Sequence, residues 1–136
     1  AEYIQTRING DGYNGDTLDG AYGYVSYFLT GESRNYKTST GAWDRIKPKT
    51  NLGKGGWGAW EVAMGYDYLN LIDGNINGGR AQTGKVGLNW YPNSHVKLMS
   101  NFIHALNIDT QGMSSRSVAY NSGNFDVVEM RAQVDF

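Results

Sequence analysis

The nine residues VEMRAQVDF (128–136) decide the fold of this 136-residue chain. Every even position of the stretch carries an apolar side chain, and every odd position carries a charged or amide side chain. Alternation with a period of two places successive side chains on opposite faces of a β-strand. The stretch therefore predicts a strand with one apolar face and one polar face, and the apolar face ends on Phe136.

The same alternation recurs along the chain, in runs separated by clusters of Gly, Asn and Asp that tolerate turn conformations. The segment around 94–108 also fits an amphipathic helix behind an N-cap serine. We interpret it as a strand because its neighbours are strands and the short connector YPNSH suits a hairpin. The sequence thus predicts six strands, roughly over 1–10, 19–31, 57–72, 80–91, 96–109 and 124–136.

Composition excludes several classes of protein. The chain has no cysteine, so disulfides, cysteine-ligated zinc and thiol catalysis are excluded. It has no run of 18 apolar residues for a transmembrane helix, but a membrane strand needs only about 9–11 alternating residues. The first residues, AEYIQTRING, lack a basic stretch followed by an apolar core, and we expect no signal peptide in them.

Tyrosine and tryptophan gather near the expected strand ends, as the aromatic girdles of a membrane barrel require. Outer-membrane barrels also commonly finish on an alternating strand with a terminal phenylalanine. The predicted fold is therefore all-β, a transmembrane antiparallel β-barrel. The girdle candidates are Trp57, Trp60, Tyr66, Tyr68, Trp90 and Tyr91.

Charge is distributed unevenly. Residues 31–56, called here the basic connector, hold six basic and two acidic side chains (+4), while the rest of the chain carries −5. This asymmetry points to an anion. If the C-terminal strand ends in the periplasm, alternating strand directions place the basic connector on the periplasmic side, where turns are normally short. We therefore expect it to fold back into the lumen and meet the permeating solute.

Four blocks resemble, in the same order, the C-terminal third of the phosphate-selective porins, the porin O and P family. They are SYFLTGESRNY (26–36), GGWGAWEVAMGYDYLNL (55–71), GLNWYPNSHVKLMSNF (87–102) and RAQVDF (131–136). The resemblance implies a sixteen-stranded, homotrimeric barrel in the outer membrane of a Gram-negative bacterium, which passes phosphate or pyrophosphate without a cofactor. Residues 1–136 would supply six C-terminal strands of this single domain. Because unpaired strand edges are costly in lipid, we expect the missing N-terminal strands to pair with the first and last strands here.

Candidate anion-binding residues follow from the charge pattern and the resemblance. Lys37 and Lys47 resemble the family's pair of pore lysines near the constriction, and a lysine ammonium suits an anion that must move on. Lys85 and Lys97 alternate with apolar residues and should face the lumen, as should Arg131, which ordinary ion pairing explains better. The alternative for the connector is a solvated basic turn. The candidates are Lys37, Lys47, Lys49, Arg34, Arg45, Lys54, Lys85 and Lys97.

Other motifs carry little. GKGGWG (53–58) matches GxGxxG but precedes a strand instead of a helix. DGNING (73–78) has calcium-loop spacing, yet its twelfth position is Gly84. His95 and His104 lack a third ligand, so we expect no metal, and nothing supports an enzyme or a nucleic-acid partner. The alternatives are a soluble β-sandwich that binds carbohydrate through exposed aromatics, and a small structural outer-membrane barrel.

Overall fold

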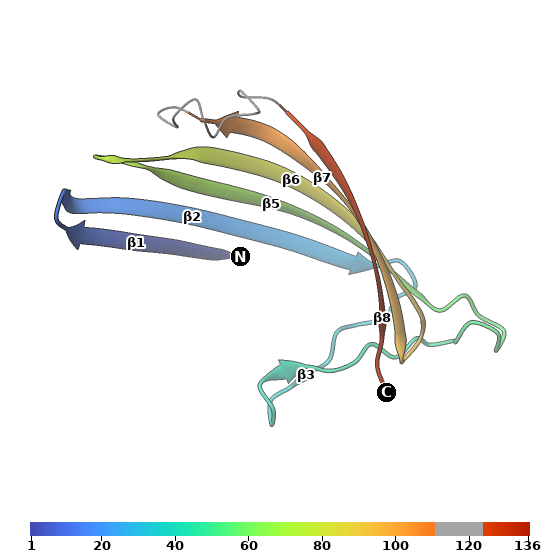
Figure 1. Cartoon of the computed structure of the whole chain (residues 1–136). Coiled ribbons are helices and arrows are strands. Elements are labelled where there is room, and N and C mark those ends of the chain that lie inside the picture. Colours follow the sequence, from blue (N-terminus) through green and yellow to red (C-terminus); the bar gives the residue numbers. More distant parts are fainter. Residues whose placement is uncertain (111–123) are drawn as a thin grey trace. The chain divides into compact units, whose positions relative to one another are not determined.

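A computed structural model describes residues 1–110 and 124–136 of the chain. Six long strands carry the fold, and their positions confirm the predicted all-β class, including the strand over 96–109 (Figure 1). Among the described residues, no helix is long and apolar enough to cross a membrane. The strands are β1 (Glu2–Gly10), β2 (Tyr13–Phe28), β3 (Tyr36–Lys37), β4 (Ala42–Trp43), β5 (Ala59–Asp73), β6 (Ile76–Asn93), β7 (Val96–Asp109) and β8 (Asp126–Val134).

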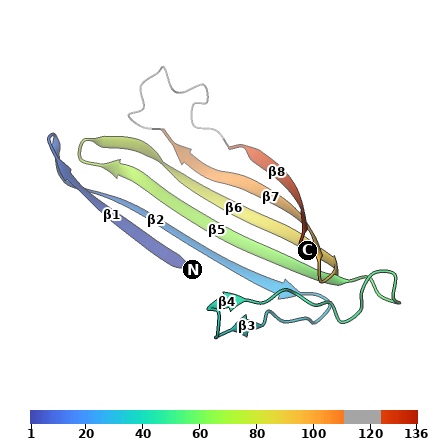
Figure 2. The same cartoon turned by 60° about the horizontal axis from the view of Figure 1, so that its bottom comes forward.

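The long strands form one sheet in the order β1-β2-β5-β6-β7-β8, and β3 and β4 form a separate two-stranded sheet (Figure 2). Strands that follow one another along the chain are therefore neighbours once the small hairpin is set aside. β1 pairs antiparallel with β2 from Glu2 opposite Tyr22 to Gly10 opposite Tyr13, with a register shift after Ile8. The outer edges of the sheet belong to β1 and β8.

Turns between the long strands are tighter than the Gly/Asn clusters suggested. Residues 11–12, 74–75 and 94–95 suffice to reverse the chain, so β2 begins six residues, and β6 four residues, before the predicted position. Ladder hydrogen bonds extend the strands through polar residues that periodicity alone assigns to connectors. Gly74 adopts a φ of +52°, a conformation that favours glycine over other residues. The predicted connector at 110–123 lies almost entirely outside the described residues.

The chain divides into two compact units, each containing parts of several long strands. The first comprises Ala1–Tyr24, Gly65–Lys85 and Ile103–Val127. The second comprises Val25–Met64, Val86–Phe102 and Val128–Phe136. The second unit therefore contains the entire basic connector, the β6–β7 turn and the C-terminus, the three features that the strand-direction argument assigned to one side.

The long strands expose large apolar side chains on one face. On β5 to β8 these side chains occupy even-numbered positions, as the period of two predicts, and few apolar side chains are buried anywhere in the described residues. So extensive an exposed apolar surface calls for a covering other than water. Exposed members include Val62, Met64, Tyr66, Val86, Leu88, Leu98, Phe102, Leu106, Val128, Met130 and Val134.

Candidate functional site: the basic connector

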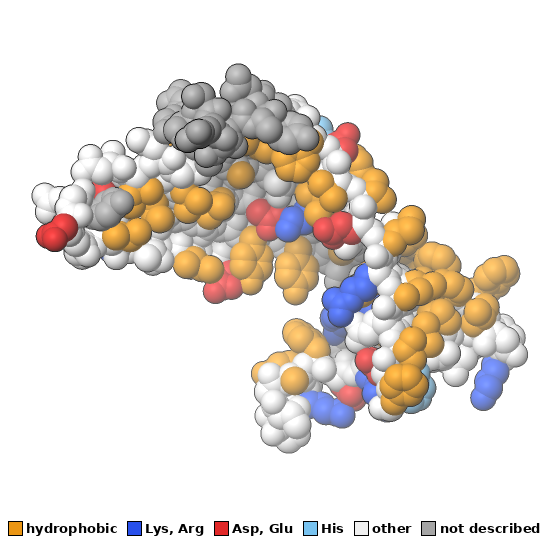
Figure 3. Space-filling view, in the orientation of Figure 1, with side chains coloured by type: hydrophobic (Ala, Val, Ile, Leu, Met, Phe, Trp, Pro, Cys, Tyr) orange, Lys and Arg blue, Asp and Glu red, His pale blue; other side chains and the backbone are white. Residues whose placement is uncertain are grey.

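The basic connector leaves β2, forms the β3–β4 hairpin and returns to β5. In the hairpin Tyr36 lies opposite Trp43 and Lys37 opposite Ala42. The rings of Tyr36 and Trp43 pack edge to face with centroids 5.2 Å apart. Both aromatic and lysine side chains lie at the surface around this hairpin (Figure 3). A short local fold thus presents Lys37 on an exposed, aromatic-braced turn.

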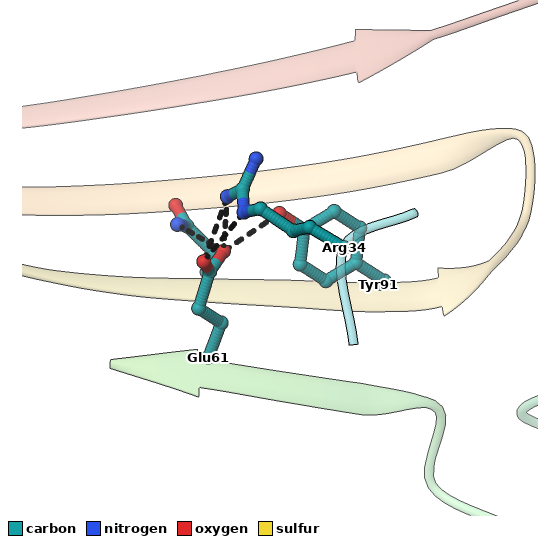
Figure 4. A network of polar contacts seen from close by, with 4 residues as sticks. Arg34, Glu61 and Tyr91 are labelled. Atoms are coloured by element: carbon teal, nitrogen blue, oxygen red, sulfur yellow. Dashed lines mark hydrogen bonds and ion pairs between the residues drawn. The ribbon is translucent and has the colours of Figure 1, made fainter. Parts of the chain in front are cut away.

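Near its start the connector is joined to β5 by an ion pair. Arg34 donates from Nη2 to both carboxylate oxygens of Glu61, at 2.7 and 2.8 Å, and from Nε to Oε1 at 3.2 Å (Figure 4). Two side chains from β6 complete the shell around that carboxylate. Asn89 Nδ2 donates at 2.9 Å and the Tyr91 hydroxyl at 2.8 Å.

Burial makes this ion pair energetically important. The Glu61 side chain is 0% exposed, whereas Arg34 retains 38% of its exposure. Removing a carboxylate from water costs several kcal/mol unless an opposite charge and further hydrogen bonds compensate. Arginine supplies a forked donor that matches both carboxylate oxygens. The Glu61 position is therefore stable only while Arg34 of the connector occupies its place.

Apolar packing attaches the middle of the connector to the sheet. Ile46 is buried in a cluster with Phe28, Ala59 and Tyr91. The rings of Phe28 and Tyr91 lie 6.0 Å apart between centroids. Isoleucine at this position removes apolar surface from water on the same face as Glu61. The connector is therefore packed against that face as well as paired with it.

Backbone contacts hold the end of the connector. The Leu52 N–H donates to the Pro92 carbonyl at 2.8 Å. Just beyond, the indole N–H of Trp90 donates to the Trp57 carbonyl at 2.7 Å. Gly58 has a φ of +73°, and a Cβ there would lie 2.2 Å from the Tyr91 carbonyl oxygen. Only glycine allows β5 to begin this close to β6.

The candidate cations of the connector have different partners. Lys37 forms an ion pair with Asp44 at 3.0 Å. Arg45 Nη1 lies 3.0 Å from Nδ1 of His95, in the β6–β7 turn. The backbone N–H of Lys49 donates to Glu32 at 3.1 Å. Among the described residues, the ammonium groups of Lys47, Lys49 and Lys54 form no ion pair within 4 Å.

The two strand lysines differ from one another. Lys97, in the second unit, places its ammonium 5.3 Å from the centroid of the Tyr91 ring, a cation–π distance. Lys85, in the first unit, forms an ion pair with Asp67 at 2.7 Å. The second unit thus brings together Lys97 and all six basic residues of the connector, and Lys85 belongs to the other unit.

Two carboxylates of the connector have lowered pKa values. The hydrogen bond from Lys37, followed by that from the Arg45 N–H, lowers the pKa of Asp44. Partial burial raises the pKa of Glu32, but hydrogen bonds from the Thr30 hydroxyl and the Lys49 N–H outweigh it, so that this pKa is lowered overall. Both groups are therefore anions at neutral pH, and they balance part of the connector's positive charge.

Sequence reasoning missed the role of Glu61 and misplaced Tyr91. The girdle prediction is wrong for Tyr91, whose side chain is only 6% exposed because odd positions of β6 share the face that carries Glu61. Trp90, one residue earlier, stacks on Trp60 with ring centroids 5.4 Å apart. The signal in the sequence was parity: Glu61 and Tyr91 both occupy polar-face positions of alternating strands.

A sheet with one exposed apolar face, an opposite face that buries a charged network, and two unpaired edge strands has the side-chain distribution of a membrane β-barrel wall. Comparison with known proteins agrees. The profile of the family "Phosphate-selective porin O and P" matches residues 1–136. The chain belongs to this porin family, which indicates a channel and not an enzyme.

Two relatives extend the comparison. An uncharacterized protein of Caulobacter vibrioides is 33% identical over 120 residues, covering 88% of this chain and 23% of the relative. Porin O of Pseudomonas aeruginosa is 32% identical over 116 residues, covering 77% of this chain and 26% of that protein. The chain therefore spans about a quarter of the length of these relatives. No solved structure matches it significantly.

Proposed function

We propose that this chain forms part of an outer-membrane pore in a Gram-negative bacterium that conducts phosphate or a related oxyanion such as pyrophosphate. One observation carries the proposal: the basic connector is fastened to the polar face of the sheet by an ion pair, an apolar side chain and a backbone hydrogen bond. A solvated basic turn needs none of these attachments. A connector folded onto the lumen wall requires them.

The mechanism is electrostatic. A monovalent ion pair at about 4 Å contributes roughly 1 kcal/mol in bulk water and ~4 kcal/mol at an effective dielectric near 20. Several such contacts in series attract an anion while each remains weak enough to release it. Lysine suits this role because its ammonium is a hydrated point charge, whereas arginine holds an oxyanion through two bonds. Lys37 and Lys47 are the principal residues proposed for anion binding, with Lys49, Lys54, Arg45 and Lys97 supporting.

The two arginines of the connector contribute differently to this mechanism. Glu61 balances the charge of Arg34, so Arg34 serves mainly to attach the connector. Arg45 faces a histidine and not a carboxylate, and it therefore adds to the positive potential. Lys85 is paired with Asp67, which reduces its contribution.

The proposal also includes partners. The edge strands β1 and β8 would pair with the N-terminal strands of the same barrel, since unpaired backbone groups in lipid cost several kcal/mol each. The exposed apolar side chains would contact outer-membrane lipid. Three copies of the full porin would form a homotrimer, as the family resemblance implies.

Reversal potentials in a planar bilayer test the proposed function. The full porin, extracted in detergent, is inserted into the bilayer, and the potential is recorded in a KCl gradient before and after phosphate is added. We expect a strongly anion-selective pore whose chloride current falls in phosphate. A cation-selective pore, or an anion pore that phosphate leaves unchanged, would contradict the proposal.

A further inference from the structure

We propose that Glu61 is a positioning residue, which fixes the basic connector through Arg34 and so holds the connector's lysines at set places along the ion path. This inference rests on the proposed function and assigns the pore a part that carries no permeating anion itself. Its substance is that anion binding depends on a buried negative charge.

Placement of the carboxylate is the first argument. Glu61 is the largest side chain that is fully buried among the described residues, and it lies on β5, a strand of the sheet. Arg34 lies 27 positions earlier, in the connector, and it reaches both oxygens of that carboxylate (Figure 4). The contact therefore joins a mobile class of structure, a long connector, to a rigid one.

The surrounding hydrogen bonds separate this role from mere stabilisation of the sheet. Asn89 and Tyr91, both on β6, already link the Glu61 carboxylate to the neighbouring strand. A glutamine at 61 could keep hydrogen bonds to both of them. What only a carboxylate provides is charge for the Arg34 guanidinium, and that guanidinium belongs to the connector.

Position along the connector is the third argument. Arg34 precedes Lys37 by three residues, and the Lys37 hairpin follows it directly. The next sheet attachment described above is Ile46, beyond the hairpin. The hairpin is thus held between Arg34 on one side and Ile46 on the other. Loss of the ion pair would free the side that carries Lys37.

A charge-neutral double variant tests the inference in the full porin. Arg34→Gln/Glu61→Gln removes the ion pair while the net charge of the pore stays the same. Asp67→Asn/Lys85→Gln is the matched control, since it removes an ion pair from the same strand β5 without touching the connector. Because this chain has no cysteine, a nitroxide at Ser39→Cys, in an otherwise cysteine-free porin, reports the motion of the hairpin.

We expect the electron paramagnetic resonance lines of the label to narrow in the Arg34/Glu61 variant and to stay unchanged in the Asp67/Lys85 control. The phosphate concentration that halves the chloride current should rise about two- to tenfold, the range expected when a preorganised side chain must instead be ordered on binding. Unchanged label mobility would overturn the inference. So would greater mobility with unaltered phosphate block, since positioning would then not matter.

A milder variant covers the case in which the double variant does not assemble. Arg34→Lys keeps the charge but loses the bidentate geometry, and we expect intermediate mobility and an intermediate phosphate effect. Values equal to those of the unmodified porin would count against the inference. Failure of the proposed function is distinguishable, because it would show as no phosphate block in the unmodified porin, whatever the label reports.

Discussion

The hydroxyl of Tyr91 on β6 donates a 2.8 Å hydrogen bond to the carboxylate of Glu61 on the neighbouring strand β5. The bond is buried, and its acceptor is also the partner of Arg34. One tyrosine thus serves two structures: its ring packs against Phe28 and Ile46, and its hydroxyl helps to hold the anchor of the basic connector.

Removal of this hydroxyl should destabilise the protein. Tyr91→Phe keeps the ring but leaves a buried carboxylate with one donor fewer, which should lower the free energy of unfolding by about 2 kcal/mol. Urea titration of the porin in lipid vesicles measures this. Tyr66→Phe is the control, because Tyr66 is exposed on the opposite face of β5, and its loss of a hydroxyl should cost little.

The fold could be predicted from the sequence because a strand that separates lipid from a polar interior records that separation in every second residue. The strand over 96–109 shows how little margin this leaves, since its apolar residues also fit a helix. Its neighbours in the sheet decided the outcome. The tight turns at 11–12 and 74–75 were missed, because ladder pairing extends strands through Asn and Gly residues that a local pattern assigns to loops.

The candidate site could be predicted only in outline. Uneven charge located the basic connector, but no local pattern shows which cation meets which carboxylate across 27 residues. Arg34 and Glu61 come together because β2 and β5 are neighbours in the sheet, a fact of topology. Tyr91 was misassigned because aromatic residues near strand ends suit both a membrane girdle and a buried cluster, and only its odd position distinguishes the two.

Gly58 should tolerate no side chain. Gly58→Ala would place a Cβ 2.2 Å from the Tyr91 carbonyl oxygen, at a φ of +73° that costs a non-glycine residue about 1–2 kcal/mol by itself. Gly53→Ala isolates the backbone cost, because Gly53 has a φ of +81° but no atom within 4 Å of its added Cβ. Thermal unfolding in detergent should show a clearly larger loss for Gly58→Ala. Equal losses would mean that the approach of β5 to β6 is not close in solution.

The Lys37 hairpin should loosen in acid. Because the folded-state pKa of Asp44 lies below its ordinary value of 3.8, the ionised carboxylate stabilises the hairpin above about pH 4, and this contribution is lost as pH falls through the lowered pKa. A nitroxide at Ser39→Cys should therefore become more mobile between pH 5 and pH 2, roughly the window of a salt-bridged aspartate. With Asp44→Asn the label should be mobile throughout, and its titration through this step should disappear.

Membrane exposure of the apolar face predicts an asymmetric response to charge. Met130 on β8 is 82% exposed, and Met130→Lys would place an ammonium against lipid. Near the bilayer midplane this costs about 2–4 kcal/mol, and less toward the interfaces. Gln133→Lys, on the opposite face of the same strand, should be nearly neutral. Folding yields into vesicles compare the two, and equal yields would argue that this face does not contact lipid.

The connector lysines should determine how strongly phosphate blocks the chloride current. Lys37→Ala/Lys47→Ala removes two positive charges, and a loss near 1 kcal/mol, the value of one pair in water, corresponds to about a fivefold rise in the half-blocking phosphate concentration. The reversal potential in a KCl gradient should also shift toward lower anion selectivity. Lys37→Arg/Lys47→Arg is the control: it keeps the charge and should lengthen the blocked events, because arginine binds an oxyanion through two hydrogen bonds. Unchanged selectivity and block in the alanine variant would remove both lysines from the ion path.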